Sequence, residues 1–528
     1  MFETSKASGS TMQTLTVKSH TVPSEFTLPL TAKEVIRNAS REELRMMAKQ
    51  EEITTQYKSA AYIAKFKSRS AAFTRTTVDQ EVTAEDRKVI LEIQAYLKTQ
   101  EIIEVDRQMC QGPVSEAFAC RLWVTKKYAR LAHMFHASLG PITGTFDKPD
   151  LWVIDVPEYS GERRILVDPD SGVTYVLGSD YYGEIKKAFL RMVMYRGKLE
   201  GGLGLHADSK EIWAKNKKSG KIERSGMLFF GLSGTGKTSL TCHDFNLNEA
   251  EGEKCRVRQD DVVILRKDGS ARGTEIEGFY IKTEGLNPVD QKALYEAAIC
   301  PQTIFENVKV ETDGSIDFGN SEISKNGRAV APVKKVINTD GDIDLPLANK
   351  IFFITRNPLT PPISKLSHEQ AAIAFMLGES IKTSAADPNA KGEAVREVGT
   401  NPFIVGSKDE EGNRFYDILK ANPKIECFLL NTGKVGKGAQ GPAKKISILD
   451  TVAILRGVCR DSIEWKKDPV LGLEVPAMVE GVDISSYELS NFFSQAELQE
   501  ALDHLRAERK AWIASFPKLK SEFSTSLY

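Results

Sequence analysis

A short apolar segment, residues 227–230, runs directly into a glycine-rich loop that ends in Lys237 and Thr238. A buried strand followed by such a loop and a helix is the phosphate-binding loop pattern. The glycines let several backbone N–H groups point into one concavity at a helix N-terminus, which attracts an anion. A chance glycine-rich turn is the weaker interpretation, because of the strand in front. The loop residues predicted to bind a nucleotide are Gly231, Leu232, Ser233, Gly234, Thr235, Gly236, Lys237 and Thr238.

Two side chains of this loop carry the expected chemistry. Lys237 is expected to reach the β and γ phosphates as a point charge, and Thr238 to offer its hydroxyl to a divalent cation. A loop lysine makes no core contact. Lys237→Ala is therefore expected to abolish phosphoryl transfer and to spare the fold.

The size and charge of the chain narrow the class of protein. A chain of 528 residues is too long for one ordinary core, so we expect at least two domains. A net charge of −1 gives no global attraction for nucleic acid or an anionic membrane. Seven cysteines without a Cys-x-x-Cys pair predict free thiols in a reducing compartment. Without a membrane-length apolar run or a leader pattern, the prediction is a cytoplasmic enzyme.

Strands and helices alternate along the chain, which predicts an α/β protein. The polar residues 215–226 indicate a domain junction, so that residues 1–222 form a substrate-side domain and residues 223–528 a nucleotide-binding domain. Residues 383–414 are polar and dotted with glycine, and form either a candidate lid or a plain surface insertion. The elements predicted from periodicity are a mainly helical stretch at 32–105, strands at 151–156, 351–354 and 427–430, and helices at 184–198 and 496–513.

Several polar residues outside the loop are candidates for metal binding. Asp260 and Asp261 follow the next strand, where phosphate-loop enzymes place a metal-binding acid, although paired aspartates also occur in solvated turns. A neutral imidazole such as His206 is a good ligand for a transition metal. Lys187 can join a metal only when deprotonated, which requires a lowered pKa. Spacing alone selects neither His206 nor Lys187, because a surface histidine and a solvated helix lysine are the simpler interpretations.

An ordered set of segments resembles one family, the ATP-dependent phosphoenolpyruvate carboxykinases. The loop sequence Phe-Phe-Gly-Leu-Ser-Gly-Thr-Gly-Lys-Thr is similar to the kinase loop of that family. One motif is a weak signal, but a set in the same order along the chain is specific. The other similar segments are Ser68-Arg69-Ser70, Tyr181 to Lys187, His206, Asp260-Asp261, Glu277 to Lys282, Glu306 to Val308, Gly327-Arg328, Asn431 to Gly433 and Lys444 to Thr451.

The resemblance implies a fold and a reaction. The fold has an N-terminal α/β domain and a P-loop mononucleotide-binding domain. The reaction converts oxaloacetate and ATP to phosphoenolpyruvate, carbon dioxide and ADP, a step of gluconeogenesis. The enolate that decarboxylation leaves needs a positive centre beside its oxygen. The resemblance implies Mn²⁺ at Lys187, His206 and Asp261, and Mg²⁺ with ATP at Thr238.

The resemblance also implies roles for single residues. Arg69, Tyr181 and Lys187 would bind the substrate, with Arg69 pairing in bidentate fashion with a carboxylate. Lys237, Arg328, Lys187 and Asp260 would serve catalysis. Glu277 and Glu306 fit either a functional or a structural role. The nucleotide contacts implied outside the loop are Glu306, Arg328, Lys445, Ile446 and Thr451.

The chain departs from the family pattern at several places, among them the N-terminal arm and residues 205–226. Val262 and Val263 stand where the family has a glutamate and a histidine, which removes second-layer contacts to the metal waters. Lys445 replaces an arginine on the adenine side and cannot stack on a purine as guanidinium does. Residues 383–414 lack the composition of the family's lid. An Ala-Asp-Ser triplet follows His206 where the family has Cys-Ser-Ala.

Three functions compete on this basis. The first is the carboxykinase. The second is a related P-loop kinase acting on another small-molecule or protein hydroxyl, which would consume ATP without decarboxylating oxaloacetate. The third is a sensor that binds ATP without turnover, and it is the weakest because both unusual metal ligands are retained. The sequence carries no signal for oligomeric state, physiological direction, preferred nucleotide or regulation.

Overall fold

The computed structural model describes residues 26, 30–69, 71–232, 234–289, 291–381, 394–437 and 442–528. Ser233 of the glycine-rich loop lies outside the described residues, as do residues 383–393 of the candidate lid. Whether residues 383–414 act as a lid stays a prediction. Within the described ranges, no helix combines the length and the apolar character that a membrane crossing requires.

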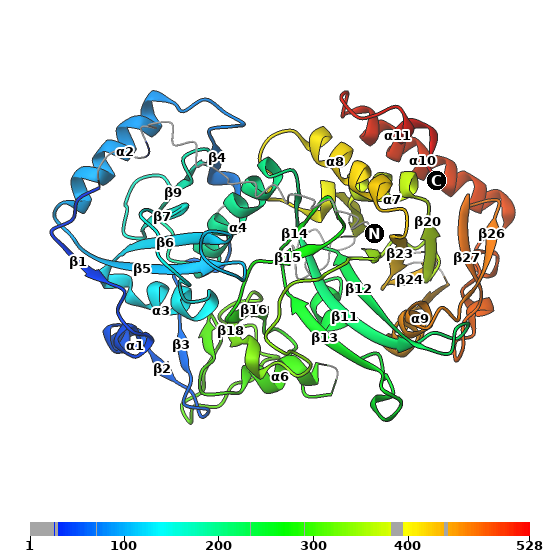
Figure 1. Cartoon of the computed structure of the whole chain (residues 1–528), viewed down its shortest axis with the longest axis horizontal. Helices are drawn as coiled ribbons and strands as arrows, with labels where there is room; N and C mark the ends of the chain where they lie inside the picture. Colours follow the sequence, from blue (N-terminus) through cyan, green and yellow to red (C-terminus); the bar gives the residue numbers. More distant parts are fainter. Residues whose placement is uncertain are drawn as a thin grey trace, which may run out of the picture.

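A seven-stranded sheet forms the blue and cyan end of the molecule (Figure 1). Its side chains alternate between two cores, as expected for a strand period of two. Ile103 packs with α3 (Ala129–Ser138) and α4 (Tyr182–Leu199), whereas Ile102 packs with α2 (Ala84–Leu97) on the other face. The strands, in spatial order, are β1 (Glu34–Arg37), β5 (Glu101–Met109), β6 (Phe118–Thr125), β7 (Leu151–Val156), β9 (Val173–Leu177), β8 (Arg164–Asp168) and β4 (Thr74–Thr76).

The expectation that residues 32–105 are mainly helical is wrong. Besides α2, the only α-helix described there is α1 (Arg41–Met47), and the stretch contains β1, β2 (Ile53–Thr54), β3 (Ala60–Tyr62) and β4. These strands are too short to show a period of two, and their partners come from other parts of the chain. The helix α2 has a clear start, because Thr83 and Asp86 form a reciprocal capping box.

An eight-stranded sheet carries the glycine-rich loop. Its centre is parallel: β12 (Ile222–Phe230) pairs with β19 (Lys350–Thr355), which pairs with β23 (Glu426–Asn431). The strand β12 contains the apolar segment 227–230, and β19 and β23 contain the predicted strands at 351–354 and 427–430. Helices cover both faces of the sheet. The remaining strands are β13 (Lys254–Gln259) and β11 (Ala207–Lys215) at one side, and β20 (Ile363–Leu366), β27 (Leu473–Met478) and β26 (Glu464–Asp468) at the other.

The two faces of this sheet have different helices. Phe230 and Phe353 pack against α7 (His368–Leu377) and α8 (Lys408–Ala421), whereas Phe229 and Phe352 pack on the side of α9 (Ile448–Cys459). The C-terminal helix α10 (Gln495–Ala514) joins the first of these cores through Leu502 and Ile513, and α11 (Glu522–Thr525) follows it. The predicted helices at 184–198 and 496–513 therefore correspond to α4 and α10.

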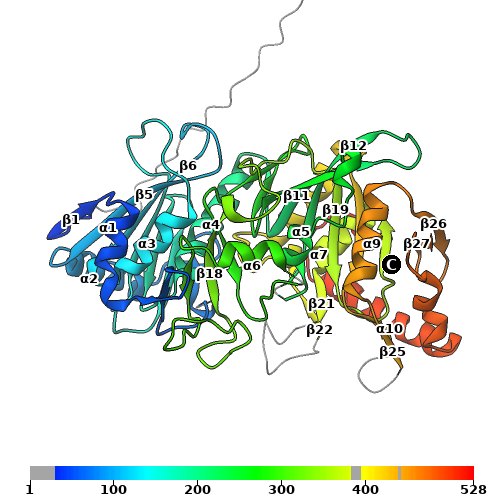
Figure 2. The ribbon, with the colours of Figure 1, turned by 90° about the horizontal axis from the view of Figure 1, so that it is seen from below.

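Four smaller sheets are also present among the described residues. In the five-stranded sheet, β3 from near the N-terminus pairs in parallel with β17 (Ile304–Glu306). Figure 2 shows β18 (Arg328–Pro332) of this sheet and α6 (Lys292–Ala298) between the blue end and the orange end of the molecule. The other strands are β16 (Gly278–Lys282) in this sheet, β10 (Leu203–Leu205), β14 (Val263–Leu265) and β15 (Ala271–Gly273) in a three-stranded sheet, and the pairs β21 (Glu379–Ile381) with β22 (Ala394–Arg396) and β24 (Lys434–Gly436) with β25 (Ala443–Lys445).

The observed elements confirm a mixed α/β protein. The division into residues 1–222 and 223–528 stays a prediction. Residues 207–215 and 222–230 pair with each other as β11 and β12 within the eight-stranded sheet. The β3–β17 pairing joins residues from the two predicted domains in the five-stranded sheet.

Candidate active site

A cavity of about 970 Å³ lies where strands of the central sheets end and α4 begins. The loop follows β12, Asp260 and Asp261 follow β13, and His206 lies between β10 and β11. Ligands of open α/β sheets bind at such carboxyl ends of strands. The predicted residues that line the cavity are Arg69, Tyr181, Lys187, His206, Leu232, Gly234, Gly236, Lys237, Thr238, Asp260, Asp261 and Arg328.

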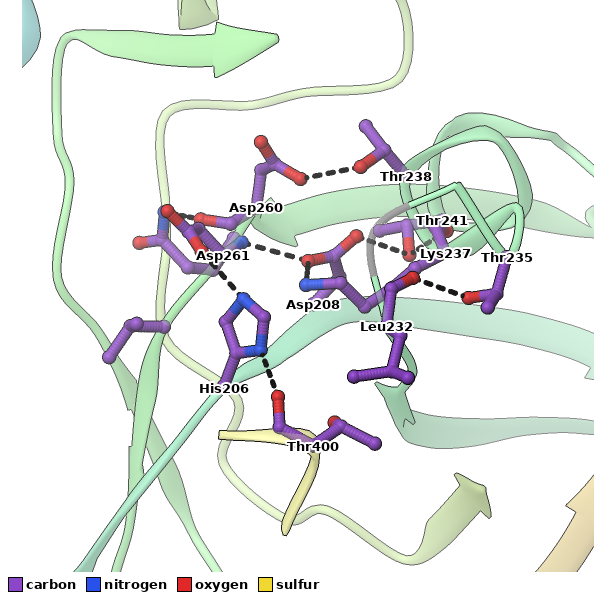
Figure 3. Close-up of polar contacts among 12 residues, drawn as sticks. His206, Asp208, Leu232, Thr235, Lys237, Thr238, Thr241, Asp260, Asp261 and Thr400 are labelled. Atoms are coloured by element: carbon purple, nitrogen blue, oxygen red, sulfur yellow. Dashed lines mark hydrogen bonds and ion pairs between the residues drawn. The ribbon is translucent and has the colours of Figure 1, made fainter. Parts of the chain in front are cut away.

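The glycines of the loop are there for backbone reasons. Gly234 and Gly236 have φ values of +81° and +95°, which a side chain disfavours. A Cβ atom on Gly231 would lie 2.6 Å from the hydroxyl oxygen of Thr235. That hydroxyl donates a hydrogen bond to the Leu232 carbonyl at 2.8 Å, which holds the turn (Figure 3). The helix α5 (Lys237–Cys242) then begins at the lysine.

A hydroxyl and a carboxyl group meet at the end of the loop. Thr238 Oγ1 donates to Asp260 Oδ1 at 3.0 Å. Burial and the nearby carboxylates of Asp208 and Asp261 raise the pKa of Asp260 to about 8. Since a positive charge would relieve this repulsion, these oxygen groups suit a hard divalent cation.

Asp261 is the centre of a second cluster. Its carboxylate accepts from Lys187 Nζ at 2.5 Å and from Lys186 Nζ at 2.5 Å, and His206 Nε2 lies 3.1 Å from Oδ1. Burial opposes the charge on Asp261, but the two ammonium groups outweigh burial and hold its pKa well below the ordinary value. Burial and the charge of Lys186 lower the pKa of Lys187 to about 7, against the pull of Asp261. Lys187 can therefore lose its proton near neutral pH.

His206 is held in one tautomer. Its Nδ1 lies 2.7 Å from the carbonyl oxygen of Thr400, which only accepts, so Nδ1 carries the hydrogen (Figure 3). Burial and the charge of Lys237 lower the pKa of His206 to about 4, so the ring is neutral at pH 7. The Nε2 lone pair then faces the Asp261 carboxylate.

The Nε2 lone pair and Asp261 Oδ1 lie only 3.1 Å apart, so a cation bound by both would remove their mutual repulsion. A transition metal ion is such a cation and accepts imidazole, carboxylate and amine donors. Among the described residues, no group of three His, Cys, Asp or Glu side chains is arranged to hold a metal. The third donor for such an ion is instead the Lys187 amine, so Lys187, His206 and Asp261 together fit a metal.

Two arginines, Arg69 and Arg328, line the cavity. The Arg69 guanidinium lies 4.3 Å from the ring centroid of Phe403, and within the described part of the chain its buried Nη1 has no hydrogen-bond acceptor. Arg328 donates to Asn326 Oδ1 through Nε at 3.1 Å and Nη2 at 2.8 Å. Asn326 Nδ2 in turn donates to the Tyr181 hydroxyl at 3.1 Å. These groups suit a small carboxylic acid.

Other predicted nucleotide contacts do not line this cavity. Lys445 is the last residue of β25, and Ile446 comes directly after it. The backbone N–H of Ile446 donates to the Gly433 carbonyl at 3.0 Å. Thr432, next to that glycine, donates through Oγ1 to the Thr235 carbonyl at 2.9 Å, so this segment adjoins the loop. Thr451 lies in α9 and donates through Oγ1 to Ser447 O at 3.0 Å. Their nucleotide roles stay predictions.

Glu306 is fully buried at the end of β17 and does not itself line the cavity. It accepts from the backbone N–H of Tyr182 at 2.8 Å and from the Tyr280 hydroxyl at 2.5 Å. Burial raises its pKa to about 6, although Arg130 nearby favours the charged form. These contacts support the structural interpretation of Glu306, and its nucleotide role stays a prediction.

Sequence reasoning missed several residues of the site. Lys186 pairs with Asp261 and with Glu275, whose Oε2 lies 3.1 Å from Lys186 Nζ. Phe403 places its ring 4.6 Å from Lys187 Nζ and edge-on to His206. Asp208 Oδ1 accepts a hydrogen bond from Lys237 Nζ at 2.7 Å. Lys186 could have been noticed in the sequence because it directly precedes Lys187. Phe403 and Glu275 carry no such local signal, because they reach the site only through tertiary contacts.

The fold and the site define a class: an α/β enzyme whose P-loop shares one cavity with Arg69 and with the buried cluster of Lys187, His206 and Asp261. The family described as phosphoenolpyruvate carboxykinase matches residues 33–485, and this chain belongs to that family. The predicted resemblance is confirmed.

Curated relatives agree with the family. Phosphoenolpyruvate carboxykinase (ATP) of Aeropyrum pernix is 34% identical over 82% of this chain and 84% of the relative. The proteins of the same name from Mesorhizobium japonicum and Sinorhizobium fredii are 27% and 26% identical, over 63% and 72% of this chain and 61% and 69% of the relatives. The family and these names point to an ATP-using carboxykinase with small-molecule substrates, and they do not favour a kinase of another kind.

Proposed function

We propose that this protein is an ATP-dependent phosphoenolpyruvate carboxykinase. It would decarboxylate oxaloacetate to carbon dioxide and the enolate of pyruvate, whose oxygen then takes the γ-phosphoryl group of ATP to give phosphoenolpyruvate and ADP. One observation carries the proposal: a single cavity is lined both by Lys237 and Thr238 and by Lys187, His206 and Asp261.

The protein's own groups would position the substrate. Arg69 has a buried Nη1 donor for a carboxylate and a planar fork that suits two-point pairing. Tyr181 would line the pocket of the leaving carbon dioxide, with its hydroxyl held by Asn326. Arg328 would balance charge on the moving phosphoryl group.

Two cations complete the proposed site. Mn²⁺ would be held by Lys187, His206 and Asp261, and Mg²⁺ with ATP would be held by Thr238. Bound there, the first cation would stabilise negative charge on the enolate oxygen, and the second would neutralise charge on the phosphates. The lowered pKa of Lys187 and the neutral ring of His206 support the first assignment. The Thr238–Asp260 contact supports the second.

Lys237 would bind the γ-phosphate and stabilise the transition state. Asp260 beside Thr238 would orient the metal waters. Unpaired thiols at all seven cysteines support the cytoplasmic location predicted from the sequence.

The test is the reverse reaction. Purified protein is given phosphoenolpyruvate, bicarbonate, ADP and Mn²⁺, and oxaloacetate is followed by coupling to malate dehydrogenase. We expect turnover that requires Mn²⁺ and ADP. Folded protein that yields no oxaloacetate under these conditions would refute the proposal. Release of ADP from ATP with another acceptor, and without decarboxylation, would instead support the related kinase.

A further inference from the structure

Asp208 joins the two halves of the site without lining the cavity itself. It lies in β11 two residues after His206, and it is 0% exposed. Its Oδ1 accepts from Lys237 Nζ at 2.7 Å and from the backbone N–H of Asp261 at 2.8 Å (Figure 3). One carboxylate oxygen therefore contacts both the phosphate-loop lysine and the metal-side aspartate.

The contact with Lys237 bears on nucleotide binding. Burial opposes the charge on Lys237, but Asp208 and the other aspartates outweigh burial and raise its pKa. An ammonium group paired with a carboxylate must share its donors when phosphate oxygens arrive. Asp208 is thus an internal competitor for the group that attracts the nucleotide.

The contact with Asp261 bears on the metal side. Asp261 has a φ of +89°, a backbone conformation that costs energy for any residue other than glycine. A buried N–H also needs an acceptor, and Asp208 Oδ1 provides it. The bond thereby helps to keep the Asp261 carboxylate directed at Lys187 and His206.

We propose that Asp208 is a positioning residue that sets nucleotide affinity by holding Lys237 and sets metal affinity by holding the Asp261 backbone. The proposal rests on the proposed function in taking Lys237 as a phosphate ligand and Asp261 as a metal ligand.

Two substitutions separate the two contacts. Asp208→Asn keeps the shape and an oxygen acceptor for the Asp261 N–H, but removes the charge that competes for Lys237. Asp208→Ala removes the acceptor as well. Thr241→Val is the matched control, because Thr241 Oγ1 lies 3.5 Å from the other oxygen, Oδ2, and makes neither contact of Oδ1.

The probes are ATP with Mg²⁺ by calorimetry, with no carboxylic acid present, and Mn²⁺ alone by electron paramagnetic resonance. For Asp208→Asn we expect about tenfold tighter ATP binding, the effect of removing a charge-assisted competitor, and Mn²⁺ affinity within about twofold of wild type. For Asp208→Ala we expect about tenfold weaker Mn²⁺ binding, as when a supporting contact to a metal ligand is lost. Thr241→Val should change neither constant.

A merely structural role would weaken both affinities together in Asp208→Asn. That result, or unchanged ATP affinity in this variant, overturns the nucleotide half of the proposal. Wild-type Mn²⁺ affinity in Asp208→Ala overturns the metal half. A wild type that binds no ATP overturns the proposed function as well, whereas normal ATP binding that is indifferent to Asp208 overturns this inference alone.

Discussion

Replacement of Lys237 by methionine is predicted to cost stability as well as activity. From the sequence, a loop lysine makes no core contact and its loss should spare the fold. In the structure, its ammonium group pairs at 2.7 Å with Asp208, whose side chain is 0% exposed. Lys237→Met would leave that carboxylate buried with little beyond the Asp261 N–H as a donor.

The size of the effect follows from this burial. Breaking a buried ion pair by removing one partner costs roughly 3–5 kcal/mol. The Lys237 side chain is 10% exposed at the cavity wall, so water can approach, and we take the lower end, about 3 kcal/mol. Adding Asp208→Asn removes the stranded charge and should restore about 2 kcal/mol of that loss.

Urea denaturation of wild type, both single variants and the double variant gives the four free energies of unfolding needed for a double-mutant cycle. Lys282→Met is a matched control, because Lys282 also lines the cavity but pairs with the partly exposed Glu284, and it should cost less than about 1 kcal/mol. If Lys237→Met unfolds at the wild-type urea concentration, or the double variant is no more stable than Lys237→Met, the reasoning about the buried pair is refuted.

Four further outcomes are expected. His206→Gln should raise the Mn²⁺ concentration needed for half-maximal activity by about tenfold or more, and equal Mn²⁺ activation of variant and wild type would show that the metal assignment is wrong. Because the pKa of Lys187 is about 7 and a metal binds only the neutral amine, Mn²⁺ affinity measured by paramagnetic resonance should fall with each pH unit below 7, and a flat profile between pH 6 and 8 would contradict this. Arg69→Lys should raise the KM for oxaloacetate by about tenfold with ATP binding unchanged, since lysine lacks the planar fork; a shift in ATP affinity instead would place Arg69 elsewhere. Glu306→Gln should lower the free energy of unfolding by about 1–3 kcal/mol while the KM for ATP stays at the wild-type value, and a raised KM with intact stability would favour a nucleotide role.

The parts of the fold that local pattern can reveal were predictable. The apolar run at 351–354, the run at 427–430 and the helix at 184–198 each have a period or composition that reports their own burial. The short strands before residue 80 have no such signal. Their existence depends on partners such as β17, which pairs with β3 from more than two hundred positions away.

The candidate site likewise contains some residues that a local sequence pattern reveals and others that it does not. Lys237 and Thr238 could be found from the loop pattern, because the chemistry of phosphate binding needs local backbone geometry. Lys187 and His206 required resemblance to a family, since neither lies in a local motif of its own. Asp208 could not be predicted as the partner of Lys237, because their meeting depends on how β11 lies beside α5.

The most direct test of the central claim is a crystal structure of the protein with ATP, Mn²⁺ and oxalate, with anomalous diffraction recorded at the manganese edge. The account predicts a manganese peak bonded to Lys187 Nζ, His206 Nε2 and a carboxylate oxygen of Asp261, with the triphosphate on the loop in the same cavity. A well-ordered triphosphate with these three side chains free of metal would contradict it.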